Sequence, residues 1–216
     1  MLNFRECRFK RTSNCDKFSD LTVSQAFIKL KSPNVPQPAV DHILEMFSKR
    51  GDSNYGGEAV SQRQHALQAA YFAEKTGADA ALITAALLHD VGHLLHDLPE
   101  DAPDHGIDDA HEKLAARWLN GKFPDSVVAP VQLHVTAKRY LCTTDAEYLK
   151  HLSGPSLQSL KLQGGLMSEE ELHEFRNHPH FEAAVRLRRW DEAAKDPHLQ
   201  TPALEHFAAY MRQVAL

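Results

Sequence analysis

Cysteine is scarce in this chain, since only 3 of its 216 residues are Cys. Cys7, Cys15 and Cys142 are odd in number and widely spaced, which argues against a disulfide framework and against a Cys-x-x-Cys metal site. The sequence also lacks an apolar run of the ~20 residues that a membrane-spanning helix needs. These absences predict a protein of a reducing, cytoplasmic compartment with no membrane partner.

Positive charge is limited as well. Lys and Arg total 24 against 29 Asp and Glu, which gives a net charge of -5 at pH 7, and the basic residues are scattered. A protein that binds nucleic acid by neutralising phosphates needs a basic surface, so nucleic acid is not an expected partner. The N-terminal segment carries basic residues but no apolar region, so it is not a secretory signal.

Sustained strand alternation is missing, whereas helical periodicity occurs along most of the chain. We therefore expect an all-α protein with a single helical bundle over residues 21–216, preceded by a loose extension over residues 1–20. Thr22 and Gln25 predict a capping box for a first helix ending near Leu30. Further helices are expected over residues 39–49, 60–75, 78–95, 109–120, 124–138, 145–152, 156–163, 168–177, 181–195 and 203–215.

Loops and helix ends have their own signals. Residues 51–57 form a loop by composition, and the acidic segment 96–109 is long enough to be a lid or the wall of a site. Ser168 and Glu171 predict a second capping box. Thr201-Pro202 predicts an N-cap followed by proline at the first helical position.

Histidine, by contrast, is abundant, with 14 residues. One of them belongs to an adjacent pair, His89-Asp90, inside the apolar run of residues 85–95. An aspartate buried there without a partner would be strongly destabilising or would be driven to protonate. A cation beside the pair is therefore expected, and a metal ion is the simplest candidate.

The spacing of the remaining candidates fits a metal site built from several helices. Side chains at i and i+1 diverge by about 100° on a helix, so His89 and Asp90 point to different sides and Asp90 can bridge toward a second metal. Any one of these histidines alone could be an ordinary surface or core residue, and Asp191 alone could be a salt-bridge partner. Together they could hold two metal ions ~3.5–4 Å apart. The candidate ligands are His65, His89, Asp90, His111, His134 and Asp191.

The order H…HD…H…H…D over residues 65–191 resembles the HD-domain superfamily. This resemblance implies a helical bundle that binds metal, but it leaves the reaction open, because most members are phosphohydrolases and a minority are di-iron oxygenases. A metal-dependent phosphohydrolase acting on a nucleotide or phosphoester is therefore one alternative. A ligand-binding module without turnover is another, although no ligand of the motif is missing.

Residues around the motif favour the oxygenase branch. His93 follows His89 by four residues and is expected on the same helical face, and Lys138 follows His134 in the same way. With their neighbours, these residues resemble the HD-domain mixed-valent di-iron oxygenases that cleave organophosphonates, over about residues 50–195. The residues that carry this resemblance are Tyr55, Glu58, His93, Lys138, Ser156, Gln163 and Arg188.

The resemblance implies two Fe ions in a mixed-valent Fe(II)/Fe(III) state, O2 as co-substrate and a small organophosphonate as substrate. Members act on 2-amino-1-hydroxyethylphosphonate, giving glycine and phosphate, or on its trimethylammonio analogue, giving glycine betaine and phosphate. Tyr55 and His93 are the implied catalytic residues. The implied substrate-binding residues are Tyr55, Glu58, His93, Lys138, Ser156, Gln163 and Arg188.

The chemistry of these side chains agrees with that assignment. A phosphonate dianion needs cationic donors such as Lys138 and Arg188, whose alternative is a solvated helix face. A substrate ammonium needs an anion or an aromatic face, which Glu58 and Tyr55 offer. Gly56-Gly57 leaves room beside them, which favours a quaternary over a primary ammonium. The oligomeric state is left open by the sequence.

Overall fold

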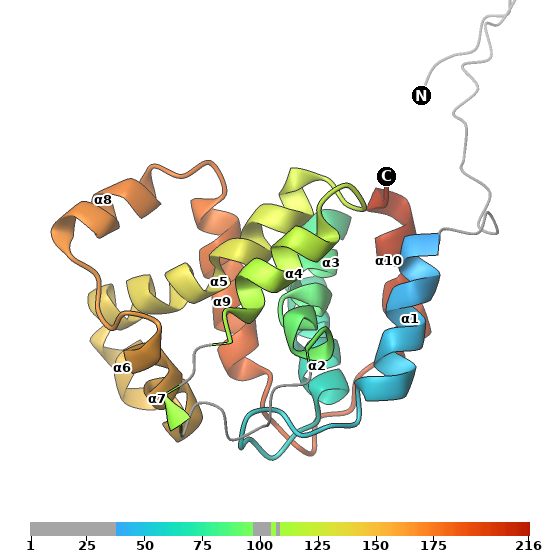
Figure 1. The fold of residues 1–216 in the computed structure, drawn as a ribbon, viewed down its shortest axis with the longest axis horizontal. Coiled ribbons are helices and arrows are strands. Elements are labelled where there is room, and N and C mark those ends of the chain that lie inside the picture. Colours follow the sequence, from blue (N-terminus) through green and yellow to red (C-terminus); the bar gives the residue numbers. More distant parts are fainter. Residues whose placement is uncertain (1–37, 97–104, 107–108) are drawn as a thin grey trace, which may run out of the picture. The chain divides into compact units, whose positions relative to one another are not determined.

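The computed structural model describes residues 38–96, 105–106 and 109–216, which belong to one compact unit, Pro33–Leu216. The predicted extension 1–20, the predicted helix over 22–30 and most of the acidic segment 96–109 lie outside the described residues. The helices are α1 (Pro38–Arg50), α2 (Gln62–Lys75), α3 (Ala80–Leu88), the 3-10 helix η1 (Val91–Leu94), α4 (His111–Leu119), α5 (Asp125–Thr144), α6 (Ala146–His151), α7 (Gly154–Leu162), α8 (Glu169–Arg176), α9 (Phe181–Ala193) and α10 (Leu204–Val214) (Figure 1).

The predicted all-α class is confirmed for the described part of the chain. Its extended contacts there are two isolated bridges, between Asn54 and Ser61 and between Asn120 and Phe123. Within these residues no helix is long and apolar enough to cross a membrane.

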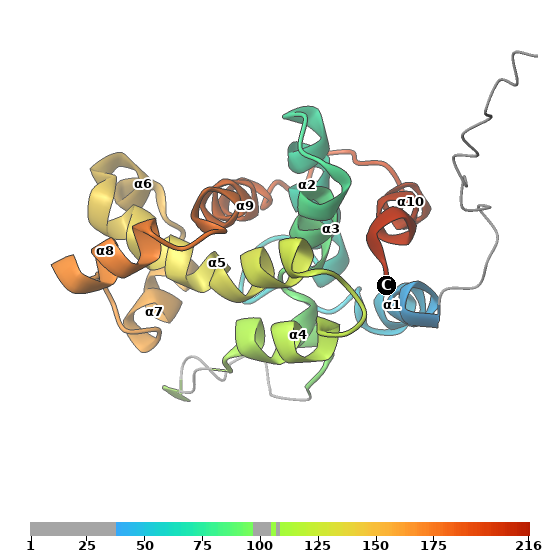
Figure 2. The same cartoon turned by 90° about the horizontal axis from the view of Figure 1, so that it is seen from above.

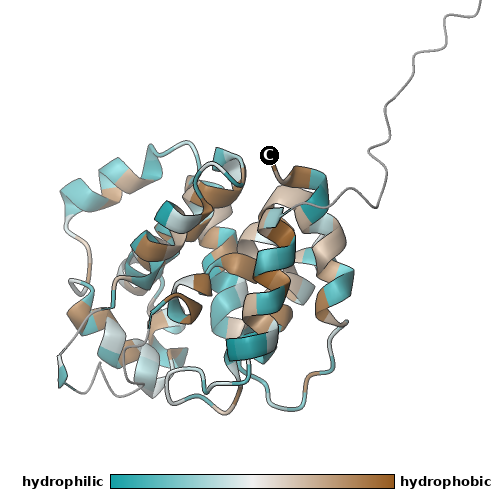
Figure 3. Ribbon diagram, turned by 45° about the vertical axis from the view of Figure 1, so that its right-hand side comes forward, coloured by the Kyte–Doolittle hydropathy of each residue, from teal (hydrophilic) through white to brown (hydrophobic). Residues whose placement is uncertain are grey.

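Helix α3 occupies the centre of the bundle because it is apolar on every side. Its residues from Leu82 to Leu88 are all buried, and it packs against α2, α5, α9 and α10 (Figure 2). Burying apolar surface contributes about 25 cal/mol per Å². In the hydropathy colouring brown segments recur along the helices in the middle of the bundle, whereas most residues of α8 are charged (Figure 3). His89 and Asp90, which follow α3 directly, are buried as well.

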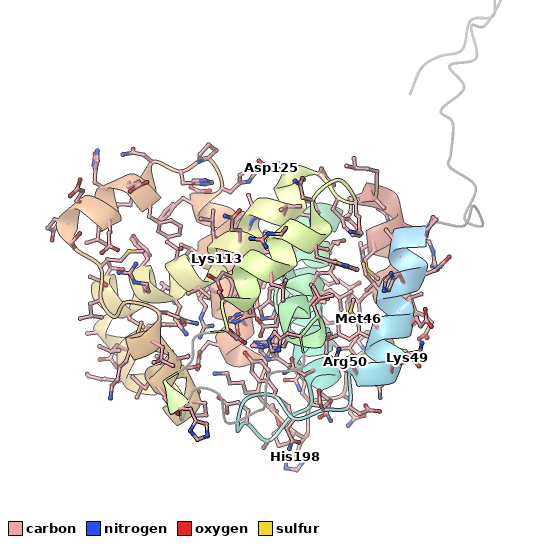
Figure 4. All side chains as sticks on the ribbon, in the orientation of Figure 1. Met46, Lys49, Arg50, Lys113, Asp125 and His198 are labelled. Carbon is pink, nitrogen blue, oxygen red and sulfur yellow. The ribbon has the colours of Figure 1, made fainter. Side chains whose placement is uncertain are left out.

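Helix α1 closes one flank of the bundle against α10. Its buried Met46 belongs to the main core. Lys49 and Arg50 lie in its last turn, where positive charges interact favourably with the helix dipole (Figure 4). At the other end of the bundle, α5 packs along α9 and carries α6 and α8. A smaller apolar cluster around Phe175 holds α8 to α5.

Two helix starts follow capping chemistry. The predicted capping box of Ser168 and Glu171 is confirmed, since Ser168 Oγ accepts from Glu171 N and the Glu171 carboxylate accepts from Ser168 N. Ser61 and Gln64 form a second, unpredicted box at the start of α2. This box sets the start of the helix that carries His65.

Three predicted boundaries were wrong. The helix expected over 78–95 ends at Leu88, and the chain turns through His89 and Asp90 into η1. The helix expected over 124–138 continues to Thr144, so His134 lies near its middle. Thr201-Pro202 does not cap α10, because Ala203 adopts the extended N-cap conformation and the helix begins one residue later.

Candidate metal centre and active site

Four buried histidines, one from each of four separate segments, meet in the bundle. In each ring Nδ1 faces an oxygen that can only accept, so Nδ1 carries the proton. In the neutral ring, Nε2 then keeps a bare lone pair, and this tautomer binds metal through Nε2. The partners of Nδ1 are Ala194 O for His65 (2.9 Å), Ala86 O for His89 (2.8 Å), Asp109 Oδ1 for His111 (2.8 Å) and Val131 O for His134 (2.7 Å).

The four Nε2 atoms face one another in two pairs. His65 Nε2 lies 3.0 Å from His89 Nε2, and His111 Nε2 lies 3.1 Å from His134 Nε2. Two bare lone pairs at such distances repel unless a cation or a proton lies beside them. The geometry of each pair is therefore that of a cation site.

Asp90 lies between the two pairs and turns one carboxylate oxygen to each. Its Oδ2 is 3.4 Å from His65 Nε2 and 3.3 Å from His89 Nε2. Its Oδ1 is 3.3 Å from His111 Nε2 and 3.4 Å from His134 Nε2. This arrangement suits a carboxylate that bridges two cation sites, and the predicted bridging role of Asp90 stays a prediction.

Asp191, on α9, lies beside the pair formed by His65 and His89. Its Oδ1 is 3.4 Å from His65 Nε2 and 3.7 Å from His89 Nε2. Asp90 Oδ1 and Asp191 Oδ1 are both buried, and neither has a hydrogen-bond partner within the described residues. Orphaned carboxylate oxygens beside bare imidazole nitrogens match the donor set of a metal ion. His65, His89, Asp90 and Asp191 together could hold one.

The pKa values of the cluster also indicate a site that stabilises a cation. Burial opposes ionisation of Asp90, yet the charge of His89 and the nearby imidazoles of His111 and His134 hold its pKa well below the usual range. Burial disfavours the imidazolium of His89, but the charges of Asp90 and Asp191 raise its pKa to about 10. When no metal is bound, protons on Nε2 of His89 and His111 would compensate the buried carboxylates, and metal binding would displace them.

Asp109 supports the second pair of histidines and was missed by the sequence reasoning. Its Oδ1 holds His111, and its Oδ2 accepts from His93 Nδ1 at 2.8 Å. The intervening Ala110 adopts a left-handed φ of 46°, a strained conformation that turns the carboxylate back toward the start of α4. An aspartate two residues before a candidate ligand was the available signal.

His93 reaches this region by a route that differs from the predicted one. It was expected on the helical face of His89, but the α-helix ends at Leu88 and the helical premise was wrong. Instead its ring stacks on His111, with centroids 4.1 Å apart. His93 therefore belongs to the half of the centre that contains His111.

Tyr55 covers the first half of the centre. Its ring stacks on that of His65, with centroids 3.7 Å apart. Burial, and then the charges of Asp90 and Asp191, raise the pKa of its phenol, so the hydroxyl stays protonated. The loop that presents it turns at Gly56 and Gly57, which both have positive φ. These glycines serve the turn.

Lys138 is a buried cation on the same face of α5 as His134. Its side chain is only 3% exposed, and its ammonium donates to Ser159 Oγ at 2.9 Å. Burial, followed by repulsion from Arg188, lowers the pKa of Lys138 to about 7. A buried ammonium held by a neutral hydroxyl is well suited to bind an anion.

Arg188 is already engaged by protein groups. Its guanidinium donates to Asp191, to Glu192 and, at 2.8 Å, to Tyr148 Oη. It therefore orients Asp191, and the predicted contact of Arg188 with a phosphonate stays a prediction.

Glu58 and Ser156 also have protein partners. Glu58 accepts from Ser153 Oγ and pairs with Lys195, whose ammonium lies 3.2 Å away. Ser156 Oγ accepts from the Lys195 ammonium at 2.9 Å and donates to Glu192. Nothing in the sequence pattern signalled Lys195.

Gln163 ends α7 as its C-cap residue. Its amide oxygen is buried and has no hydrogen-bond partner within the described residues. Its predicted contact with substrate stays a prediction.

Two curated proteins match most of the chain. The [1-hydroxy-2-(trimethylamino)ethyl]phosphonate dioxygenase (glycine-betaine-forming) of Leisingera caerulea is 41% identical over 175 residues, covering 81% of this chain and 89% of that protein. The hydroxymethylphosphonate dioxygenase of Gimesia maris is 43% identical over 180 residues, covering 82% and 89%. The chain belongs to the HD-domain phosphonate oxygenase family.

Membership in the phosphonate oxygenase family confirms the predicted resemblance, and no family model matches the chain in addition. It also gives the buried His and Asp cluster a metal-binding interpretation, and dioxygenase relatives suggest iron. The predicted oxidoreductase class is confirmed over the phosphohydrolase alternative.

Gly92 lets η1 approach α4 closely enough to place His111 in this oxygenase. A Cβ built on Gly92 would lie 2.1 Å from the backbone oxygen of His111, a distance that no relaxation of a side chain can relieve. Gly92→Ala is therefore expected to push His111 away from Asp90, at a cost of about 1–3 kcal/mol in unfolding free energy. Iron content per chain and thermal unfolding measure both effects.

Gly154→Ala is the matched control, because nothing lies within 4 Å of its added Cβ. The control is expected to keep its iron and its melting temperature. Full iron content in Gly92→Ala would contradict the claimed role of the close approach between η1 and α4.

Proposed function

We propose that this protein is a di-iron oxygenase that uses O2 to cleave the carbon–phosphorus bond of a 1-hydroxyphosphonate. The observation that carries the proposal is the Asp90 carboxylate, which turns one oxygen to each of two histidine pairs. The two relatives support the substrate class, since both are named for phosphonates with a hydroxyl on the carbon bound to phosphorus.

The reaction balances without an external reductant. The carbon–phosphorus bond and the C1–H bond of R–CH(OH)–PO₃H₂ break, and C1 is oxidised to a carboxylic acid while O2 is reduced. The products are R–COOH and H₃PO₄, which together contain every atom of the substrate and of O2. For R = aminomethyl the acid is glycine, and for R = trimethylammoniomethyl it is glycine betaine.

The proposed irons would be held in two groups that share Asp90. His65, His89 and Asp191 would hold one iron, and His111 and His134 would hold the other. In a mixed-valent Fe(II)/Fe(III) state, the pair would supply one-electron chemistry with O2 and Lewis-acid binding of substrate oxygens.

The surrounding side chains would bind and orient the substrate. Lys138 would bind a phosphonate oxygen as a buried cation, because its ammonium is held by the neutral Ser159 hydroxyl. His93, oriented by Asp109, would be a further donor on the side of His111. Tyr55 would cover the first iron through its stacking on His65 and would move aside when substrate enters.

The test is a substrate panel with the iron-loaded protein under air. Hydroxymethylphosphonate, 2-amino-1-hydroxyethylphosphonate and its trimethylammonio analogue would be compared with nucleotides and a phosphoester, and phosphate would be measured. We expect phosphate from at least one hydroxyphosphonate and none from the esters. Phosphate from nucleotides alone would instead indicate the phosphohydrolase chemistry that is common in HD domains.

A further inference from the structure

Lys195 lies just beyond α9, largely buried between two carboxylates. Its ammonium is 3.2 Å from Glu58 Oε1 and 2.8 Å from Glu192 Oε1, and it donates to the hydroxyls of Ser153 and Ser156. The three charged side chains are only 12–15% exposed. Water therefore screens their mutual attraction weakly.

The position of Lys195 is fixed by the same segment that supports the metal centre. Ala194 O accepts from His65 Nδ1. On the other side of Lys195, the Gln68 amide donates to Asp196 O at 2.8 Å and accepts from Asp196 N at 3.1 Å. Lys195 is thus held between two backbone anchors, and its ammonium is not a mobile surface charge.

The network is continuous with the centre. Arg188 links Asp191 to Glu192, Glu192 pairs with Lys195, and Lys195 pairs with Glu58. Glu58 in turn belongs to the turn that presents Tyr55, since Glu58 N donates to Tyr55 O at 2.7 Å. The carboxylate expected to receive a substrate ammonium is therefore already neutralised by a lysine.

A cationic substituent would meet two obstacles here. It would have to compete with Lys195 for the Glu58 carboxylate, and it would then lie beside the Lys195 ammonium, which repels it. A substituent without charge meets neither obstacle. The turn glycines Gly56 and Gly57 also lose their value as a sign of a bulky ammonium site, because their positive φ accounts for them.

We infer that Lys195 is a specificity-determining residue that disfavours substrates with a cationic substituent and selects 1-hydroxyphosphonates with an uncharged one. The inference rests on the proposed function. Its expected consequence is a wild-type preference for hydroxymethylphosphonate over 1-hydroxy-2-(trimethylammonio)ethylphosphonate, expressed as the ratio of their kcat/KM values.

The test compares that ratio in the iron-loaded wild type, Lys195→Met and Lys195→Arg. Lys195→Met removes the ammonium that neutralises Glu58, so the ratio is expected to shift at least about tenfold toward the trimethylammonio substrate, mainly through a lower KM for it. Lys195→Arg keeps the charge and should keep the ratio close to that of the wild type. Lys49→Met, at a position 69% exposed on α1, is the control for removing a lysine charge elsewhere (Figure 4).

Glu58→Gln gives an independent reading of the same pair. It leaves Lys195 without this carboxylate, so the ratio should move further toward hydroxymethylphosphonate. Equal losses on both substrates in Lys195→Met, with the ratio unchanged, would overturn the inference and leave the proposed function intact. No phosphate from either substrate in the wild type would overturn both.

Discussion

Asp90→Asn is expected to abolish turnover and to leave at most one iron per chain. The amide keeps the shape of the carboxylate but offers one neutral oxygen, whereas Asp90 turns a charged oxygen to each histidine pair. The charge that holds His89 and His111 in the cluster is lost at the same time. Iron analysis of the purified protein, together with phosphate release, measures the effect.

Asp125→Asn provides the matched control for Asp90→Asn. Asp125 is 81% exposed at the start of α5, where its carboxylate pairs with His180 at the end of the helix away from His134 (Figure 4). This variant should retain iron and activity. Two irons per chain in Asp90→Asn would mean that the bridging interpretation of Asp90 is wrong.

Lys138→Met is expected to lower kcat/KM for a hydroxyphosphonate by about 10- to 150-fold. A hydrogen bond to a charged group contributes about 1.5–3 kcal/mol, and the methionine removes the buried cation while keeping the length of the side chain. Lys138→Arg should retain much of the activity because its charge persists. Steady-state kinetics on the iron-loaded proteins should give the highest kcat/KM for the wild type, a lower value for Lys138→Arg and the lowest for Lys138→Met.

The pH profile gives Lys138 a more specific signature. Burial lowers its pKa to about 7, so the ammonium that binds phosphonate is present below that pH and is lost above it. The kcat/KM of the wild type should therefore fall as pH rises through about 7, since this parameter reports the free enzyme. In Lys138→Arg the falling limb should move to higher pH, and an unmoved limb would assign the titration to another group.

Much of the fold follows from local patterns in the sequence. The helical ranges come from apolar periodicity, and the box at Ser168 comes from capping chemistry, both of which are set by neighbouring residues. The helix predicted over residues 78–95 ends early, at Leu88, and the reason is a tertiary contact. Gly92 must pack on the backbone of His111, and that contact is invisible to periodicity.

In the candidate site, too, some features were predictable from the sequence and others were not. The metal cluster was predictable because six ligand-type residues occur in a known order, whereas the helical argument that placed Asp90 relative to His89 did not hold, since α3 ends at Leu88. The partners of those residues were not predictable. Lys195 and Glu58 lie 137 positions apart in the sequence. They meet because the end of α9 packs against the loop before α2.

The most direct test of the proposed oxygenase reaction is the stoichiometry of O2 uptake and phosphate release by the iron-loaded protein acting on a hydroxyphosphonate. The proposed reaction predicts one O2 consumed for each phosphate and each carboxylic acid formed, and no phosphate when O2 is removed. Phosphate release that continues at the same rate without O2 would contradict it.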